Sequence, residues 1–421
     1  MRPFKVVVGV CLLALCSSPV VAQQSRAPSA VSATLTKEGA ARLDQWIADA
    51  VATGRMTGSV VMVVRNGEVA FLKQHGLADR DTGRKVQQDD IFRIYSMTKP
   101  VVSAALLVLY DEGKFQLDDP LERYIPEFAN LKVFAGTNQD GSFILEEPRR
   151  KPTVLDAFRH TVGVSAGAGP SPVDRLYVER GILVNQLDSL EDQMRLLGDV
   201  PLQFHPGERW LYGYSHDIQA ALVERLSGMK LSDFLAQRIF EPLRMSDTGF
   251  GVPAAKRSRV VALHDVPEGP PPYPAVDMRP ATYERFADHP MGTLGLWSTA
   301  PDYARFAQML LNGGELDGVR ILGRKTVELM AMNHLPPAIG NLGAAQGSPG
   351  TGYGLGVSVQ LDVAADANLS SVGAFGWSGA ATTHFIVDPE EQMVAVLMAQ
   401  KAPLDSRLIT EFQTMVYQAV E

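Results

Sequence analysis

The strand-forming segments of this chain lie at its two ends, and this placement constrains the fold more than any other feature. Two β-rich runs, residues 59–65 and 68–74, are joined by Asn66-Gly67, a dipeptide typical of tight hairpin turns. Three more runs near the C-terminus have the composition of strands: 353–360, 382–388 and 393–399. We expect all of these runs to form one sheet, with the intervening helices inserted between its two halves.

Helical patterns fill much of the remaining chain. Apolar residues recur with helical spacing over 36–53, which predicts a helix packed on the sheet. The segment 97–112 is apolar nearly all round and is followed by Gly113, so we expect a buried helix that ends there. Long loops are predicted at 136–152 and 266–290, where glycine and proline gather.

These patterns predict an α/β fold class, in which an antiparallel sheet flanked by helices carries an inserted, mainly helical lobe. The expected α/β sandwich domain comprises residues 36–113 and 290–421. The inserted helical domain comprises residues 114–289.

The first residues have the layout of a secretory signal peptide. A basic start at Arg2 and Lys5 precedes an apolar stretch, and small residues end at Ala22. We therefore expect residues 1–22 to be removed and the protein to be periplasmic or secreted, with no stable membrane span. The alternative is a buried N-terminal helix. A lipid anchor at Cys16 is the weaker interpretation, since Leu15 stands where a small residue would be needed.

Charge and cysteine content exclude several classes of function. The chain has 39 Lys and Arg against 47 Asp and Glu, a net charge of −8, which argues against nucleic acid as a partner. Both cysteines, at positions 11 and 16, lie in the predicted signal peptide. The mature chain would then have no disulfide and no catalytic thiol. His160, His205, His264 and His289 show no metal-ligand spacing, so we predict no metal.

Ser96-Met97-Thr98-Lys99 begins the predicted buried helix and is the first candidate for chemistry. Residues i and i+3 share one face of a helix, so the Ser96 hydroxyl should lie beside the Lys99 amine. A serine hydroxyl becomes a good nucleophile when a neighbour takes its proton. The same pattern also fits a capping serine and a surface lysine. The apolar residues around Lys99 favour the catalytic interpretation.

Tyr212 is the second candidate. It follows a Pro-Gly-Glu-Arg turn at 206–209 and precedes a predicted helix over 217–226. A lysine ammonium about 4 Å from a phenolate stabilises it by about 4 kcal/mol at an effective dielectric of about 20. Lys99 could therefore help Tyr212 to accept a proton. The alternative is a buried aromatic residue whose hydroxyl has some other partner.

The third candidate is Gly376-Trp377-Ser378-Gly379-Ala380, before the predicted strand 382–388. Its glycines would let a substrate approach the backbone closely. The alternative is a simple turn before an edge strand. His384 follows in that strand and could point at a substrate, while His216 and Asp217 could support the segment that carries Tyr212.

A second serine motif competes with Ser96. Residues 163–167 read Gly-Val-Ser-Ala-Gly, the pattern of a nucleophile elbow centred on Ser165. That motif needs a strand before it and a helix directly after it. Here a helical stretch ending at His160 precedes it and a Gly/Pro/Ser-rich loop follows. We therefore predict that Ser165 is not the nucleophile.

Together, Ser-x-x-Lys at Ser96, Trp-x-Tyr ending at Tyr212 and Trp-x-Gly at Trp377 resemble the motifs of family VIII carboxylesterases. These are relatives of class C β-lactamases and D-alanyl-D-alanine peptidases. The resemblance implies that Ser96 attacks an acyl carbonyl while Lys99 and Tyr212 move the proton. It also implies an oxyanion hole made by the backbone N–H groups of Ser96 and Ala380, and no metal or organic cofactor.

Two departures from the lactam-processing relatives bear on the substrate. Tyr214 stands where they usually have asparagine, and Trp377-Ser378-Gly379 stands where they have Lys-Thr-Gly. Both changes remove groups that would meet a substrate amide or carboxylate. We expect a serine hydrolase of small carboxylic esters. The alternatives are a β-lactamase or D-alanyl-D-alanine-type peptidase, and a non-catalytic penicillin-binding sensor.

Overall fold

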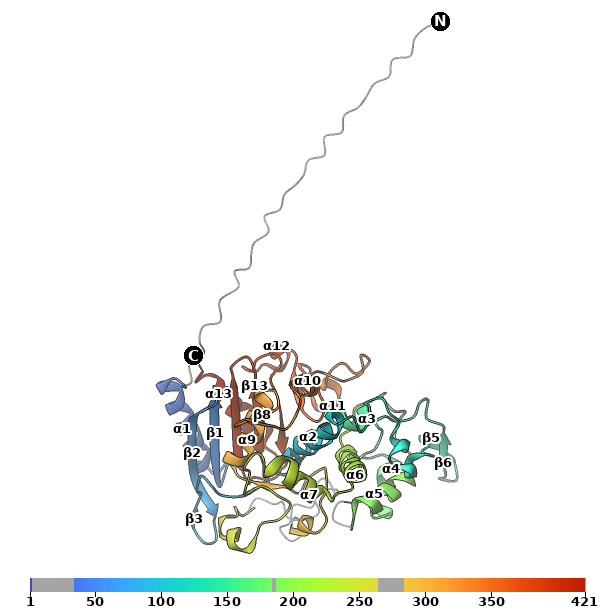
Figure 1. Ribbon diagram of the computed structural model, residues 1–421, viewed down its shortest axis with the longest axis horizontal. Helices are drawn as coiled ribbons and strands as arrows, with labels where there is room; N and C mark the ends of the chain where they lie inside the picture. Colours follow the sequence, from blue (N-terminus) through green and yellow to red (C-terminus); the bar gives the residue numbers. More distant parts are fainter. Residues whose placement is uncertain (2–33, 184–186, 264–283, 421) are drawn as a thin grey trace. The chain divides into compact units, whose positions relative to one another are not determined.

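The two ends of the chain build one sheet, as the sequence predicts. The computed structural model describes Met1 and residues 34–183, 187–263 and 284–420. Eight strands pair antiparallel in the order β10-β11-β12-β13-β14-β1-β2-β3 (Figure 1). They are β1 (Gly58–Arg65), β2 (Glu68–Asp79), β3 (Arg84–Lys85), β10 (Thr351–Tyr353), β11 (Ser358–Gln360), β12 (Phe375–Gly379), β13 (Thr383–Asp388) and β14 (Met393–Ala399).

The N-terminal and C-terminal strands meet inside the sheet, where β1 pairs with β14 from Ser59↔Ala399 to Arg65↔Met393. The predicted turn between β1 and β2 is confirmed, because Asn66 and Gly67 have φ values of 50° and 79°. A tight hairpin turn of this kind requires positive φ at both central residues. Every residue of β1 is buried, so both faces of the sheet are covered here.

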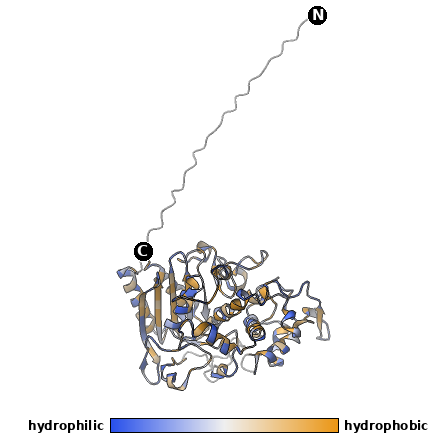
Figure 2. Ribbon diagram, in the orientation of Figure 1, coloured by the Kyte–Doolittle hydropathy of each residue, from blue (hydrophilic) through white to orange (hydrophobic). Residues whose placement is uncertain are grey.

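Helices cover both faces of the sheet. On one face α1 and α13 pack over an apolar cluster, and on the other α2 and α9 pack over a second cluster (Figures 1 and 2). The helices are α1 (Lys37–Ala52), α2 (Thr98–Asp111), α3 (Val154–Phe158), α4 (Pro172–Glu179), α5 (Leu190–Gly198), α6 (Ser215–Ser227), α7 (Leu231–Leu235), α9 (Ala300–Leu311), α10 (Arg324–Met330), α11 (Gly343–Gln346), α12 (Val363–Asp366) and α13 (Ser406–Tyr417).

The second apolar cluster continues from the sheet into the helical part of the chain. It contains Val60 of β1, Leu106 of α2 and Leu222 of α6. Residues Ser32–Glu421 form one compact unit. The domain boundaries at 114 and 289 therefore stay a prediction. Signal-peptide residues 2–22 lie outside the described part of the chain.

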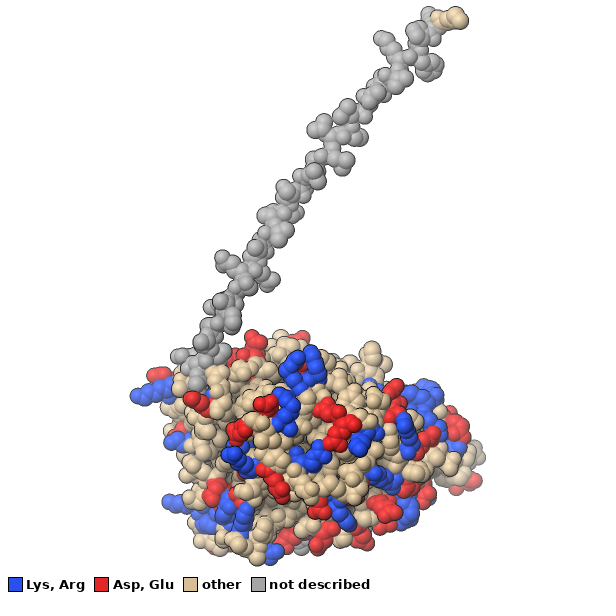
Figure 3. Space-filling model, in the orientation of Figure 1, with Lys and Arg blue, Asp and Glu red and all other residues tan. Residues whose placement is uncertain are grey.

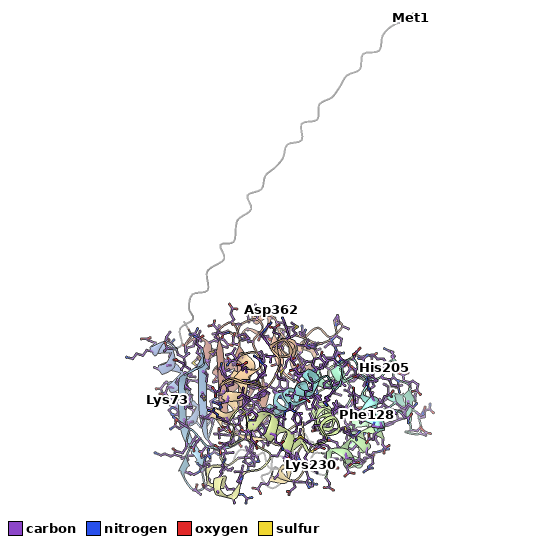
Figure 4. All side chains as sticks on the ribbon, viewed as in Figure 1. Met1, Lys73, Phe128, His205, Lys230 and Asp362 are labelled. Carbon is purple, nitrogen blue, oxygen red and sulfur yellow. The ribbon has the colours of Figure 1, made fainter. Side chains whose placement is uncertain are left out.

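The prediction of a loop over 136–152 is wrong in part. Within the predicted loop 136–152, β5 (Val133–Thr137) and β6 (Phe143–Glu146) form a hairpin, which Phe134 and Phe143 stabilise with ring centroids 4.9 Å apart. His205, labelled in Figure 4, lies beside this hairpin with its Nε2 2.8 Å from Glu146 Oε1.

The alternative interpretation of the Trp-x-Gly segment as a simple turn is also wrong. The segment is strand β12, because its backbone pairs with β13 from Phe375↔Val387 to Gly379↔Thr383. Of the predicted loop 266–290, residues 266–283 lie outside the described part.

The distribution of surface charge and the character of the helices bear on what the protein can bind. Basic and acidic side chains are interspersed over the face shown in Figure 3. Among the described residues, no helix has the length and apolar character needed to cross a membrane.

The remaining short strand pairs are β4 (Phe92–Arg93) with β7 (Trp297–Ser298) and β8 (Glu315–Leu316) with β9 (Val319–Arg320).

Candidate active site

Ser96 lies in a short 3-10 turn, Tyr95–Met97, that leads directly into α2. Tyr95 has a φ of 45°, a left-handed conformation that is uncommon for a residue with a bulky side chain. The end of β12 presses against this turn. A Cβ on Gly379 would lie 2.3 Å from the carbonyl oxygen of Ile94, so only glycine allows the approach. The serine is thus held between the helix and the sheet.

The structure brings the three predicted catalytic side chains together. Lys99 Nζ donates to Ser96 Oγ at 3.1 Å, and the Tyr212 hydroxyl donates to the same oxygen at 2.7 Å. Lys99 is completely buried, and its Nζ lies 4.4 Å from the centroid of the Tyr212 ring. Ser96 Oγ therefore lies within reach of two groups that can take its proton.

Lys99 has a further partner that the sequence did not indicate. Its Nζ donates to the carbonyl oxygen of Thr293 at 2.8 Å. Thr293 in turn donates both its backbone N–H and its hydroxyl to Asp217, each at 2.8 Å. Asp217 was predicted to support the segment that carries Tyr212. The structure shows it holding the residue that binds Lys99.

Aromatic rings surround Tyr212. The rings of Trp210 and Trp377 each lie 5.9 Å from it, and Tyr353 lies 5.3 Å from Trp377. The His160 ring lies 4.9 Å from Tyr212 on the buried side. Sequence reasoning missed Tyr353 and His160 in this role, since neither has a spacing that links it to the three motifs.

Two buried imidazoles lie against each other beside the site. The rings of His160 and His216 lie 4.8 Å apart, and their nitrogens make no hydrogen bond within the described part of the chain. Burial, followed by the charge of Lys99, holds the pKa of His160 well below its usual value. Burial, His160 and Lys99 act in the same direction on the pKa of His216. Both rings are therefore neutral at neutral pH.

Five other predicted residues lie around β12 and α6. Trp377 faces Tyr212, whereas Ser378 and His384, paired across the strands, share a hydrogen bond of 2.9 Å. Tyr214 is buried with its ring stacked 6.1 Å from Tyr177 of α4. Ala380 directly follows β12 and Gly379, beside the turn that carries Ser96.

His384 points toward α13. Its Nε2 lies 3.2 Å from the side-chain nitrogen of Gln413, and its ring lines a polar cavity of about 300 Å³. Burial lowers the pKa of His384 to about 4. Among the described residues, no hydrogen bond joins His384 to Ser96. The partners of His384, Ser378 and Gln413, therefore give no support to its predicted contact with a substrate.

Ser165 has a structural role in the described chain. Its buried hydroxyl donates to Asp174 Oδ1 at 2.6 Å and accepts from the backbone N–H of Gly167 at 3.1 Å. Helix α3, rather than a strand, precedes this segment. The described residues also contain no group of three or more His, Cys, Asp or Glu side chains placed to hold a metal.

The segment that carries Tyr212 is anchored by a buried carboxylate. Asp156 accepts hydrogen bonds from Arg150, Arg159 and Thr161. The backbone carbonyl oxygen of Thr161 accepts a hydrogen bond from the backbone N–H of residue 207. The carbonyl oxygen of the adjacent His160 accepts one from the backbone N–H of residue 211. Burial by itself raises the pKa of Asp156, but the hydrogen bonds and charge of Arg150, with the other donors, outweigh it and hold the pKa below its usual value.

Replacing this carboxylate should destabilise the fold. We expect Asp156→Asn to lower the free energy of unfolding by about 3 kcal/mol, since it leaves the largely buried guanidinium group of Arg159 and the half-buried one of Arg150 without their anion. Because the folded pKa is depressed, the contribution is present above the unfolded pKa of about 3.9 and is lost as pH falls through the folded pKa. Urea unfolding at pH 7 and pH 3 measures both effects. An equal loss at both pH values would contradict the argument.

The sheet with helices on both faces, and the serine between a lysine and a tyrosine, define an enzyme that uses serine for hydrolysis. The chain belongs to the beta-lactamase family, whose model matches residues 43–416. It is 32% identical to Esterase EstB of Burkholderia gladioli over 382 residues, covering 86% of this chain and 91% of EstB.

Two further comparisons extend this relationship. The chain is 27% identical to lovastatin esterase of Penicillium rubens, over 88% of this chain and 96% of that protein. Among solved structures, EstCE1, a hydrolase with promiscuous acyltransferase activity, superposes with a TM-score of 0.74 at 24% identity. That match covers 90% of this chain and 99% of the EstCE1 chain. The predicted fold class and the predicted family are confirmed.

Proposed function

We propose that this serine hydrolase cleaves small, uncharged carboxylic esters, with Ser96 as the nucleophile. The observation that carries the proposal is the convergence of Lys99 and Tyr212 on Ser96 Oγ, at 3.1 and 2.7 Å. Nucleophile and base within hydrogen-bond reach are the signature of covalent catalysis. Similarity to EstB and to lovastatin esterase supports an ester as the substrate.

The reaction proceeds in two halves. As Ser96 Oγ bonds to the ester carbonyl carbon, its proton passes to the Tyr212–Lys99 pair. The bond to the alcohol oxygen then breaks, and that oxygen leaves with the proton. Water next adds to the acyl-enzyme carbonyl and gives a proton to the same pair, which returns it to Ser96 as the acid departs. The backbone N–H groups of Ser96 and Ala380 stabilise the oxyanion in both halves.

Trp377 favours an ester over a lactam. Its ring packs between Tyr212 and Tyr353, in the motif where lactam-processing relatives have lysine. An indole supplies no charge to meet a substrate carboxylate, and its apolar surface favours uncharged groups. Trp377 also adjoins a cluster formed by Trp210, Leu335 and Leu342, which extends this apolar surface.

Parallel assays test the proposal. We expect the wild-type protein to hydrolyse a short p-nitrophenyl ester with a kcat/KM at least about a hundredfold above that for nitrocefin. Nitrocefin carries a carboxylate, and a site without a cationic partner for that group binds it more weakly by on the order of 2–3 kcal/mol. This free energy corresponds to about a hundredfold in kcat/KM. A greater kcat/KM for nitrocefin would instead establish the lactamase alternative. Stoichiometric acylation without turnover of either compound would establish the sensor alternative.

We also propose that the reaction takes place in the periplasm or outside the cell. The support is the basic, apolar and small-residue order of residues 1–22. N-terminal sequencing of the protein from a cell's periplasm or medium tests this, with Gln23 expected as the first residue.

A further inference from the structure

The buried position of Lys99 raises the question of what balances its charge. None of its side-chain surface is exposed to water. A buried ammonium is strongly disfavoured unless hydrogen bonds and an opposite charge compensate for lost solvation. Its neighbours Ser96 Oγ, Thr293 O and the Tyr212 ring are neutral dipoles when Tyr212 is protonated. A carboxylate close behind one of them would supply the missing charge.

Asp217 meets this requirement. It lies in the first turn of α6, is completely buried, and accepts from both donors of Thr293 at 2.8 Å. The carbonyl of the same Thr293 accepts from Lys99 Nζ, also at 2.8 Å. One residue therefore joins the carboxylate to the amine. A third donor, Gln193 Nε2 of α5, binds the other side of Asp217 at 3.1 Å.

The partners of Asp217 favour its ionised form. The backbone N–H of Thr293 and the side-chain amide of Gln193 are obligate donors, and a carboxylate accepts from both. Burial has the largest effect and raises the pKa of Asp217 above its usual value, while the hydrogen bonds from Thr293 and Gln193 and the charge of Lys99 act in the opposite direction and favour the carboxylate. The link to Lys99 is thus both geometric and electrostatic.

We propose that Asp217 is a positioning residue that acts through Thr293, orienting Lys99 and balancing its ammonium charge while Ser96 is acylated. The inference rests on the proposed function, because it assigns Lys99 a part in proton transfer. Asp217 touches neither the substrate nor Ser96. Its influence is carried by the Thr293 peptide and by the field of its charge.

The other titratable groups around Lys99 do not supply this charge. Tyr212 faces it and is neutral while its hydroxyl donates to Ser96 Oγ, and the imidazoles of His160 and His216 lie close enough for the charge of Lys99 to lower their pKa values. Both imidazoles are neutral when unprotonated and positive when protonated, so they cannot balance an ammonium. Asp217 is an acidic group on which the charge of Lys99 acts directly.

The test compares two isosteric changes in the full chain. Asp217→Asn removes the charge next to Thr293. Asp302→Asn removes another largely buried carboxylate, which accepts from Thr248 and from the backbone of Asp247 rather than from Thr293. For each variant, kcat and KM for p-nitrophenyl acetate are measured from pH 5 to about 10, together with Tm. Ser96→Ala is included as the inactive reference.

We expect Asp217→Asn to move the limbs of the kcat/KM profile to lower pH by about one unit, since loss of a negative charge lowers the proton affinity of nearby groups. We also expect kcat to fall about tenfold, in keeping with one unit of proton affinity, with KM within about threefold of wild type. Asp302→Asn should lower Tm while its profile stays in place.

Two results would overturn the inference: an unshifted profile for Asp217→Asn, or the same shift in Asp302→Asn. If Asp217→Asn does not fold, Gln193→Leu takes its place, since it removes one donor from the carboxylate. Without this donor, the carboxylate exerts more of its negative charge on Lys99, so the acid limb of the kcat/KM profile of Gln193→Leu should move to higher pH. An unmoved limb would overturn the inference. Full activity of Ser96→Ala would instead reject the proposed function itself.

Discussion

Ser96→Ala should abolish ester hydrolysis. We expect kcat to fall by at least about four orders of magnitude, because removal of a nucleophile that acts with its base leaves only the residual effect of binding and the oxyanion hole. The Lys99 amine and the Tyr212 hydroxyl would lose their shared partner, while the amine keeps its bond to the Thr293 carbonyl and the Tyr212 ring keeps its contact with Trp377. Hydrolysis of p-nitrophenyl acetate under initial-rate conditions measures the loss, and a fluorophosphonate should fail to label the variant.

Ser165→Ala is the matched control for this prediction. Ser165 is a buried serine with two hydrogen bonds, to Asp174 and from Gly167. Its loss should lower the free energy of unfolding by about 1–2 kcal/mol and leave kcat within about threefold of wild type. If Ser165→Ala were inactive while folded and Ser96→Ala were active, the nucleophile would be misassigned.

Tyr212→Phe should have the second largest effect. The change removes only the hydroxyl that donates to Ser96 Oγ at 2.7 Å and leaves the ring among His160, Trp210 and Trp377. General acid–base catalysis contributes about 10²–10⁴ in rate, so we expect kcat to fall by that factor. KM should change little, because the phenol acts on the reacting oxygen. Steady-state kinetics with a short p-nitrophenyl ester measures both constants.

Tyr417→Phe provides the same chemical change at a distance. Its hydroxyl donates to Asp388 Oδ2 at 2.6 Å, on the α13 side of the sheet. This variant should lose stability while its kcat stays near that of wild type. Equal losses of kcat in the two variants would mean that the effect of Tyr212→Phe arises from folding, and the role given to Tyr212 would be wrong.

Local sequence was sufficient for the framework of the fold. Asn66-Gly67 requires a tight turn whatever surrounds it, and β1 and β2 follow from it. The spacing of Ser96 and Lys99 places them on one helix face, because that relation depends only on helix geometry. The hairpin β5–β6 escaped prediction, since its pairing depends on contact between Phe134 and Phe143 as much as on its glycines.

The sequence motifs by themselves determined which residues are the candidates for catalysis, whereas the tertiary structure decided that these residues meet. Tyr212 reaches Ser96 across 116 positions of the chain. Alternation along β12 puts Trp377 and Ser378 on opposite faces, but only packing against α13 decides which face meets Tyr212. Thr293 and Asp217 come to Lys99 through hydrogen bonds between distant segments. Such contacts form when the core closes, and no local periodicity encodes them.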